Sequence, residues 1–469
     1  MKRTTAAAAA LIPVLAGCTV AGNAAGGGDA IKIVVGYQSK TINTVTAGTL
    51  LRSLGYFEKR LDALGRSEGK KYSVVWQDYD TGAPITAQML AGKIDIGSMG
   101  DYPLLINGSR AQAQGGDART ELVSVTGYNR RGSLNGVVVA GDSRARTLRD
   151  LKGEKVSASV GSAGHGTLVQ ALEKYGMDAG DVKVENQQPS VGSSALESGG
   201  VAALAQFVAW PGLLVNKGQA RLLYDGGDLD VPTFHGVVVR KAFAGEKGKV
   251  LQAFLGAQIE ATRYLHADPV KAAESVASTT GLPPETVYLY NGRGGVATFD
   301  TTIKKPLRDA LSHDVPFLKS IGVIRSPLDV GPFVNDAYIR QAYGPAYDRD
   351  AVSTVNPAAI KGTDPVCKKP VGDDAGEIWV DGEAVTRPSA GPGCLLKGVR
   401  ELRAQGKKVR AAYIPDPTTG TRWFADKSVW VEGPGKSFTP FATREHADKH
   451  LAARPGTRIV TYDEAVARA

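Results

Sequence analysis

The sequence predicts an α/β protein with largely parallel sheets, followed by a smaller α+β domain. Short β-rich runs alternate with helix-like segments from Ile31 to about Tyr343, and a second set of strands and helices begins near Thr363. The 469 residues correspond to about three domain-sized units, which is enough for a bilobed protein with an appendage. Apolar residues make up 42% and aromatic residues 7%, which is typical of a globular protein and argues against disorder.

The strand-like runs are short, apolar and rich in β-branched residues, and helix-like segments lie between them. This alternation favours largely parallel sheets, because a strand followed by a helix commonly returns to a parallel strand. The expected strands are Ile31 to Val35, Tyr72 to Tyr79, Ile94 to Ser98, Val137 to Ala140, Val156 to Val160, Val182 to Glu185, Arg221 to Tyr224 and Val237 to Arg240. The expected helices are Thr44 to Leu54, Ile85 to Ala91, Thr167 to Tyr175, Lys247 to His266 and Pro269 to Thr279.

A linker is expected at 344–362, where proline-containing turns such as Asn356-Pro357 follow Tyr343. Residues 363–469 then form the predicted α+β domain. Its expected elements are Glu377 to Val380, Leu395 to Gln405, Lys408 to Tyr413, Ser428 to Val431, Arg444 to Ala453 and Arg458 to Thr461.

The N-terminus has the pattern of a secretion signal. Lys2 and Arg3 precede an apolar stretch, and Leu15-Ala16-Gly17-Cys18 resembles the lipobox of bacterial lipoproteins. The resemblance implies that residues 1–17 are removed and that Cys18 is acylated, with 18–30 as a flexible tether. A plain secretory signal with an incidental cysteine is the alternative. No other apolar stretch approaches the roughly 18 residues needed to cross a bilayer.

The formal net charge is +9, but the Lys and Arg residues are scattered along the chain. Scattered charge favours a solvated basic surface over a nucleic-acid site. Apart from Cys18, the cysteines are Cys367 and Cys394, which form a candidate disulfide in an oxidising compartment.

Glycine-containing turns follow several predicted strands and open the next helix. Helix N-termini present unpaired N–H groups and a partial positive charge, which favour anions. The carboxyl ends of strands border the ligand crevice in α/β sheets, so converging turns would form an anion site. One such turn alone is weak evidence, because such turns are more often simple strand-to-helix punctuation, but their repetition at equivalent positions favours a site. The turns are Gly36-Tyr37-Gln38, Thr81-Gly82-Ala83-Pro84, Gly100-Asp101-Tyr102-Pro103 and Gly161-Ser162-Ala163-Gly164-His165-Gly166.

Three segments resemble the nitrate-, taurine- and aliphatic-sulfonate-binding proteins of ABC importers. They are GYQSKTINTVTAGTLLRSLGYFEKRL from Gly36, LAGKIDIGSMGDYPLLING from Leu90 and RTLRDLKGEKVSASVGSAGHGTLVQALEKYGMDAGDVKV from Arg146. The resemblance implies a bilobed type II periplasmic-binding-protein fold over 31–343. Lobe 1 would span about 31–126 and 232–343, lobe 2 would span 127–231, and the lobes would close on the solute by hinge motion.

The same resemblance implies a set of ligand-binding residues in the cleft. From the first lobe these are Gln38, Gly82, Gly100 and Asp101, although Asp101 alternatively caps the helix that begins at Tyr102. From the second lobe they are Ser162, Gly164, His165 and Gly166, which match a Gly-Ser-x-x-His loop. His165 alternatively orders its loop, and a contact that required its protonation would weaken above pH ~6.5.

The segment VAALAQFVAWPGLLVNKG departs from the family pattern. Ala202 replaces a common Asp, Phe207 replaces the usual Trp, and Trp210 follows downstream. Phe207 and Trp210 either pack against an organic tail of the ligand or fill the core. This departure leaves the identity of the solute open.

Residues from about Thr363 resemble, more faintly, the NosL family of copper-associated lipoproteins. The segments DPVCKKPVG, GPGCLLKGVREL, AAYIPDPTTGTRWFADKSVWV and FATREHADKHLAARPGTRIVTYDEA carry the resemblance. Soft thiolate ligands select Cu(I), but the family's Met is absent, with Lys369 and Pro370 in its region. Cys367 and Cys394, with His446 or His450, could hold Cu(I), or the two cysteines could form a disulfide.

We therefore expect an extracytoplasmic, lipid-anchored, monomeric solute-binding protein that delivers a small anionic solute to the permease of an ABC importer. No cofactor, nucleic-acid partner or catalytic residue is expected. An enzyme related to thiamine-pyrimidine synthases is the first alternative, but those enzymes use a cysteine-rich motif and the α/β region contains no Cys. A copper-handling protein dominated by the C-terminal domain is the second.

Overall fold

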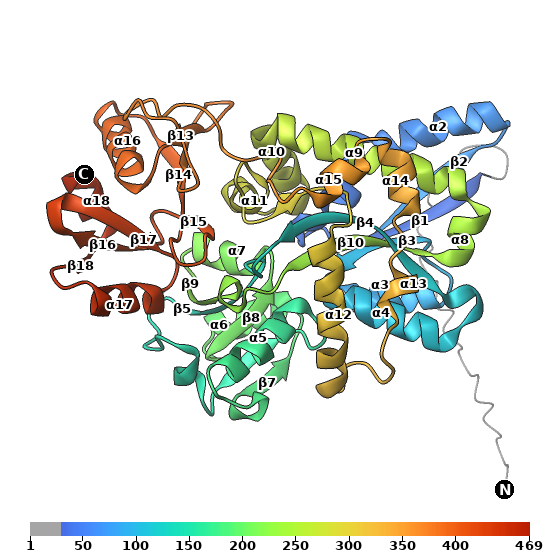
Figure 1. Ribbon diagram of the computed structural model, residues 1–469, viewed down its shortest axis with the longest axis horizontal. Coiled ribbons are helices and arrows are strands. Elements are labelled where there is room, and N and C mark those ends of the chain that lie inside the picture. Colours follow the sequence, from blue (N-terminus) through green and yellow to red (C-terminus); the bar gives the residue numbers. More distant parts are fainter. Residues whose placement is uncertain (1–29) are drawn as a thin grey trace, which may run out of the picture.

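The computed structural model describes residues 30–469. The expected signal peptide, the acylated Cys18 and nearly all of the tether lie outside these residues. Two α/β lobes and a C-terminal domain follow one another along the long axis of the molecule (Figure 1). Within 30–469, no helix is both long enough and apolar enough to span a membrane.

Lobe 1 contains a six-stranded sheet in the order β11-β4-β10-β3-β1-β2. Strand β1 pairs in parallel with β2 and β3, whereas β10 is antiparallel to β3 and β4. The strands are β1 (Ile31–Tyr37), β2 (Tyr72–Asp78), β3 (Ile96–Gly100), β4 (Thr120–Asn129), β10 (Thr233–Arg240) and β11 (Thr298–Phe299).

Lobe 2 contains a five-stranded sheet in the order β7-β6-β8-β5-β9. Strand β6 is parallel to β7 and β8, and β5 is antiparallel to β8 and β9. The strands are β5 (Asn135–Ala140), β6 (Lys155–Ala158), β7 (Lys183–Asn186), β8 (Ala203–Phe207) and β9 (Ala220–Asp225). Both sheets are thus mixed, which corrects the expectation of largely parallel sheets.

Strands β4, β5, β9 and β10 carry the chain between the lobes. The first crossing joins β4 to β5 through 130–134, and the second joins β9 to β10 through 226–232. Because β4 pairs with β10 and β5 pairs with β9, the two crossings lie side by side. An exposed ion pair between Arg131 and Asp230, at 3.1 Å, links them. A pair of adjacent connections of this kind forms a hinge.

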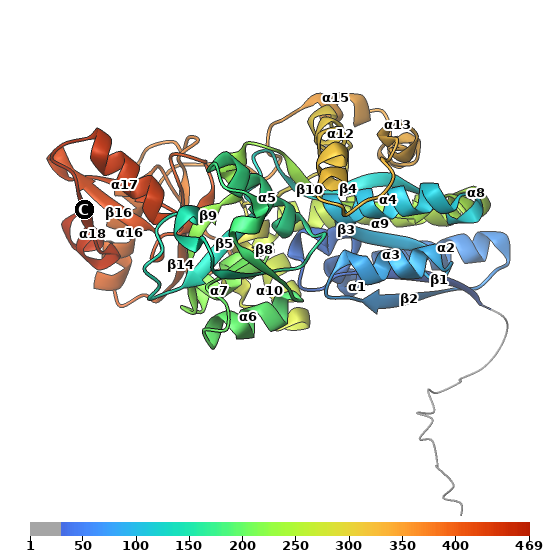
Figure 2. The same cartoon turned by 90° about the horizontal axis from the view of Figure 1, so that it is seen from below.

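Helices pack on both sheets (Figure 2). The expected helix over Thr44 to Leu54 is divided at Gly48 into a 3-10 segment and α1. Lobe 1 has η1 (Ile42–Ala47), α1 (Thr49–Leu54), α2 (Tyr56–Glu68), α3 (Gly82–Leu90), α4 (Asp101–Gln114), α8 (Lys241–Glu246), α9 (Gly248–Ala267), α10 (Pro269–Thr280), α11 (Pro284–Asn291), α12 (Lys305–Ser320), α13 (Val330–Phe333) and α14 (Ala337–Tyr343). Lobe 2 has α5 (Ala163–Lys174), α6 (Pro189–Glu197) and α7 (Trp210–Asn216).

The segment expected to be a linker is partly ordered against lobe 1. It contains α15 (Tyr347–Val352), whose Tyr347 is buried, and the N–H of Gly294 donates to the carbonyl of Ala358. The proline-containing turns of this segment did not reveal that the connecting chain packs.

The C-terminal domain has two small antiparallel sheets, β13-β12-β14-β15 and β17-β16-β18, covered by three helices. Its strands are β12 (Gly376–Val380), β13 (Arg387–Ser389), β14 (Val409–Pro415), β15 (Arg422–Phe424), β16 (Val429–Gly433), β17 (Ser437–Phe441) and β18 (Arg458–Val460). Its helices are α16 (Pro392–Ala404), α17 (Arg444–Ala453) and α18 (Tyr462–Arg468). The domain is α+β, and Cys367 is disulfide-bonded to Cys394.

This domain is docked on the lobes through buried contacts. Trp379, Tyr413 and Trp423 belong to the same apolar cluster as residues of α7, α10 and α11. Thr419 and Thr421 donate hydrogen bonds of 2.7 and 2.5 Å to the buried Asp225, which ends β9. The C-terminal domain therefore packs beside the second interlobe crossing.

Candidate functional site

A cavity of about 390 Å³ lies between the two lobes. Its volume falls in the range of ~300–1,000 Å³ that is usual for small-molecule sites. The first turns of helices from both lobes and the ends of the preceding strands form its polar wall.

The lobe 1 side of the cavity includes the N-terminus of α3 and the turn before α4. Thr81 precedes α3 without making a side-chain capping bond, so the first N–H groups of the helix have no partner within it. A Cβ atom at Gly82 would lie 2.6 Å from Cβ of Pro103. Glycine at this position therefore lets α3 meet α4, in addition to lining the cavity. Gln38, from the end of β1, donates to the carbonyl of Ser98 at 3.2 Å.

The lobe 2 side includes the N-termini of α5 and α6. Ser162 precedes α5, and its Oγ accepts from the N–H of His165 at 3.2 Å. Asn186 Oδ1 accepts from the N–H of Val160 at 3.1 Å, which holds the turn after β6 beside the end of β7. Gln188 is the N-cap of α6. Two helix N-termini from each lobe thus approach one cavity.

The charge of the cavity wall is compatible with an anion. Among the described residues, no Asp or Glu lines the cavity, and Arg110 contributes one cationic side chain. Apolar side chains from both lobes and from the segment after α12 complete the wall: Ile106, Val160, Ile321 and Val323. The cavity therefore combines polar donors with an apolar wall that could contact an organic group.

The structure places five of the ten predicted ligand-binding residues on the cavity wall: Gln38, Gly82, Gly100, Ser162 and Phe207. The other five, Asp101, Gly164, His165, Gly166 and Trp210, are not among its lining residues. All ten assignments as ligand contacts stay predictions.

Asp101 has partners within the protein. It is the first residue of α4, and its Oδ1 accepts from the N–H of Tyr102 at 2.8 Å. Its Oδ2 accepts from the Thr233 hydroxyl at 2.6 Å and from the Phe234 N–H at 3.1 Å. Burial raises the pKa of Asp101 to about 6, although these hydrogen bonds oppose the shift. Asp101 therefore fastens α4 to the start of β10, beside the hinge.

The remaining four residues have packing contacts instead of cavity positions. A Cβ at Gly164 would lie 2.7 Å from Cα of Gln206, and a Cβ at Gly166 would lie 2.4 Å from the Tyr102 ring. Both glycines therefore allow close packing of α5. His165 is buried, which lowers its pKa, and its Nδ1 faces the Gly161 N–H at 3.5 Å. Trp210 belongs to the core shared with the C-terminal domain.

Several lining residues were not among the predicted ligand contacts. Thr81 and Ala83 belong to a turn that was recognised, but Asn186, Gln188 and His235 carried no motif or spacing that marked them. They reach the cavity because β7, α6 and β10 end or begin at its rim. Only the fold brings them together.

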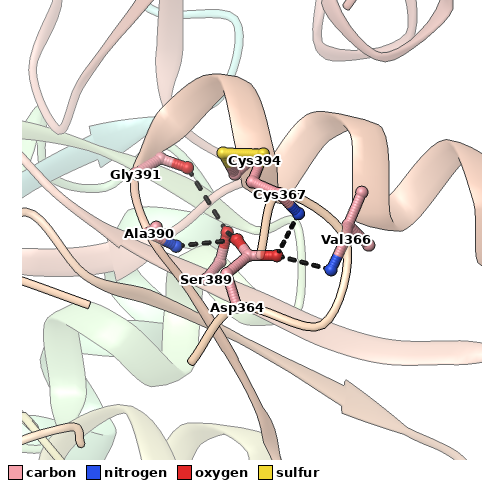
Figure 3. The surroundings of a disulfide bond; sticks show 7 residues. All are labelled: Asp364, Val366, Cys367, Ser389, Ala390, Gly391 and Cys394. Atoms are coloured by element: carbon pink, nitrogen blue, oxygen red, sulfur yellow. Dashed lines mark hydrogen bonds between the residues drawn. A yellow bond between two sulfur atoms is a disulfide. The ribbon is translucent and has the colours of Figure 1, made fainter. Parts of the chain in front are cut away.

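The two cysteines of the C-terminal domain form a disulfide beside Asp364 (Figure 3). The possible ligand atoms of Asp364, Cys367 and Cys394 lie within 4.8 Å of one another. Asp364 accepts from the N–H groups of Cys367 at 2.8 Å and Ala390 at 2.8 Å. Burial opposes ionisation of Asp364, but its backbone hydrogen bonds lower its pKa.

Neither histidine suggested as a copper partner accompanies these sulfur atoms in that cluster. His446 is held between Asp416 and Asp228, at 3.0 and 2.9 Å. The Phe441 ring lies 5.0 Å from that of His450. In the disulfide form neither sulfur is a thiolate, so the Cu(I) expectation concerns only a reduced protein.

The two lobes, the paired crossings and the cavity between the lobes define a bilobed, type II periplasmic-binding-protein fold. The family described as "NMT1/THI5 like" matches residues 76–272.

Two Escherichia coli (strain K12) proteins are similar in sequence to this chain. An Escherichia coli (strain K12) protein named for binding aliphatic sulfonates is 29% identical over 256 residues, covering 55% of this chain and 74% of that protein. The taurine-binding periplasmic protein of the same organism is 24% identical over 319 residues, covering 65% and 95%.

Solved structures support the fold. The alkanesulfonate-binding protein SsuA from Xanthomonas axonopodis pv. citri, bound to MOPS, aligns with a TM-score of 0.55 and 23% identity, covering 66% of this chain and 99% of that chain. The periplasmic nitrate-binding protein NrtA from Synechocystis PCC 6803 aligns with a TM-score of 0.53 and 13% identity, covering 70% and 92%. Neither alignment accounts for the full length of this chain.

Proposed function

We propose that this protein is an extracytoplasmic solute-binding protein of an ABC importer that captures a small organic anion, most simply an organosulfonate. The observation that carries the proposal is the cavity between the lobes. Helix N-termini from both lobes open into it, and no Asp or Glu of residues 30–469 lines it. Each such N-terminus stabilises an anion by ~0.3–1 kcal/mol. The names of the relatives, which refer to sulfonates and taurine, agree with this chemistry.

The apolar part of the wall favours an organic tail over a bare inorganic anion. Nitrate has no apolar part, so its binding would leave the apolar surface of Ile106, Ile321 and Val323 in contact with water. Burial of a methylene group contributes ~0.8 kcal/mol, so a sulfonate gains affinity when its tail reaches these side chains.

A transport role further implies a membrane permease as partner. The lipobox-like segment Leu15 to Cys18 supports a lipid anchor at the outer face of the cell membrane. In this proposal the protein binds the solute and carries out no enzymatic step on it. A monomer is sufficient, because both walls of the cavity come from one chain.

Calorimetry with a series of alkanesulfonates tests the proposed function. We expect affinity to rise about fourfold per added methylene group that reaches the apolar wall. The variant Ala83→Glu, at the start of α3, should weaken binding about 10- to 100-fold because it adds a like charge to the cavity. Acidic residues are favourable in a first helical turn, so the fold should persist.

The matched control is Ala337→Glu, at the exposed start of α14, away from the cavity. It should bind as the unaltered protein does. Absence of binding heat with every alkanesulfonate, or equal affinity in the Ala83→Glu variant, would contradict the proposal.

A second candidate function concerns the C-terminal domain. Cys367 and Cys394 lie together, so their reduction would present two soft thiolate ligands at one place, and this pair supports a Cu(I) site in the reduced state. We expect the reduced full-length protein to bind one equivalent of Cu(I) and Cys367→Ser to abolish this binding. Equal uptake by the oxidised protein, or by the Cys367→Ser variant, would exclude this site.

A further inference from the structure

His235 is a buried histidine on the cavity wall. It lies on β10, just after the second interlobe crossing, and is 3% exposed. It is the one histidine that lines the cavity among residues 30–469, and its strand pairs with β3 so that His235 is opposite Gly100.

A single neighbour determines which ring nitrogen carries the proton. Asn43 Nδ2 lies 2.5 Å from His235 Nδ1 and 3.5 Å from the carbonyl oxygen of Gly127. The carbonyl oxygen of Gly127 can only accept a hydrogen bond, so its neighbour must be the amide nitrogen of Asn43 and not the amide oxygen. The same nitrogen therefore faces His235 Nδ1. The amide therefore donates to Nδ1, and in the neutral imidazole the hydrogen is on Nε2.

Nε2 of His235 lies beside Gly100, and both residues are on the cavity wall. A Cβ atom at Gly100 would lie 3.1 Å from Nε2 and 3.3 Å from Cε1 of His235. Gly100 has φ −71° and ψ 167°, a conformation that any residue can adopt. Backbone geometry therefore does not require glycine here, but a side chain at this position would press against the edge of the imidazole that carries Nε2.

We propose that His235 Nε2–H donates a hydrogen bond to the oxyanion head group of the solute and that Asn43 positions this donor. The inference deepens the proposed function and rests on it, because it assigns a specificity-determining donor to lobe 1.

The donor is neutral. Burial lowers the pKa of His235 to about 3, so the imidazole carries no charge near neutral pH. A fixed N–H group selects an oxyanion that can accept its hydrogen bond. Because the ring stays neutral near neutral pH, titration of His235 should not change the affinity there. The expected pH behaviour thus differs from that of a contact requiring protonated His165.

Two variants test the donor by calorimetry with butanesulfonate. His235→Met removes the N–H group, and Gly100→Ala places a methyl group against Nε2 while leaving the histidine in place. Each should weaken binding about 10- to 100-fold, the range for one hydrogen bond to a charged acceptor. Gly245→Ala, on the exposed part of α8 with no atom near the added Cβ, is the control and should bind normally.

Nitrogen NMR of the unaltered protein, labelled with ring-15N histidine, provides a measurement that does not depend on variants. We expect His235 to carry its proton on Nε2 and the Nε2 signal to shift when butanesulfonate is added. If the unaltered protein binds butanesulfonate but Nδ1 carries the proton, or the Gly100→Ala variant keeps full affinity, the inference is overturned while the proposed function stands. If the unaltered protein binds no sulfonate, the proposed function itself fails.

Discussion

Replacing Arg422 by Met is expected to destabilise the C-terminal domain by about 3–5 kcal/mol, because it leaves a buried carboxylate without its cation. Arg422 Nη2 lies 2.7 Å from Glu377 Oε2, and the two side chains are 4% and 1% exposed. The guanidinium also lies 4.4 Å from the centre of the Tyr413 ring. Urea unfolding followed by tryptophan fluorescence measures the loss, since Trp379, Trp423 and Trp430 all lie in this domain.

The control for this prediction is Arg403→Met. The ion pair of Arg403 with Asp463 has side chains that are 49% and 80% exposed, so its loss should change stability by about 1 kcal/mol or less. Combining Arg422→Met with Glu377→Gln should recover part of the loss, because the unpaired charge is then removed. Equal destabilisation by Arg422→Met and Arg403→Met would show that the buried pair makes no special contribution.

The Arg422 and Glu377 pair also explains why the C-terminal domain is docked instead of tethered. Tyr288, on α11, donates to Glu377 Oε2 at 3.1 Å, and Arg422 also donates to the carbonyl of Arg293. Both charged partners come from the C-terminal domain, but lobe 1 supplies hydrogen bonds that satisfy them. Separation of the domain from the lobes would therefore expose apolar surface and, at the same time, break the hydrogen bonds from lobe 1 to the Arg422 and Glu377 pair.

Local sequence patterns were sufficient to predict much of the fold. The predicted helix Arg444 to Ala453 coincides with α17, and each predicted strand overlaps an observed one. Strand β4 was missed because it is buried on both faces and its polar residues interrupt the apolar pattern. Ser124, for example, donates at 2.7 Å to Gln258 of α9, a partner that only the folded protein supplies.

The candidate site was predictable where a residue type and its place in a strand-to-helix turn coincide. Gly82, Gly100 and Ser162 are found on the cavity wall for this reason. Gly164 and Gly166 follow the same pattern but serve packing, and sequence alone does not distinguish an open N–H group from a close helix contact. His235 was missed because its role depends on Asn43, which is distant in sequence.

The docked domain makes stability depend on pH through His446. Its Nδ1 and Nε2 lie 3.0 Å from Asp416 and 2.9 Å from Asp228, so both ring nitrogens donate and the ring is protonated. Burial disfavours the charge, but hydrogen bonds to Asp228 and Asp416 outweigh it and raise the pKa of His446 to about 10. Asp228 lies in the second interlobe crossing, so this charge joins the C-terminal domain to that crossing.

The direction of the pH effect follows from the two pKa values. An unfolded histidine has a pKa of about 6.5, so the contribution of His446 is fully present below pH ~6.5 and is lost as pH rises through about 10. Between these values the free energy of unfolding should fall by up to ~1.4 kcal/mol per pH unit. His446→Gln should reduce this slope in urea unfolding at pH 6.5, 8 and 9, whereas His450→Gln, on the same helix, should retain it. If His446→Gln leaves the slope unchanged, the histidine is not the charged link between the C-terminal domain and the second interlobe crossing.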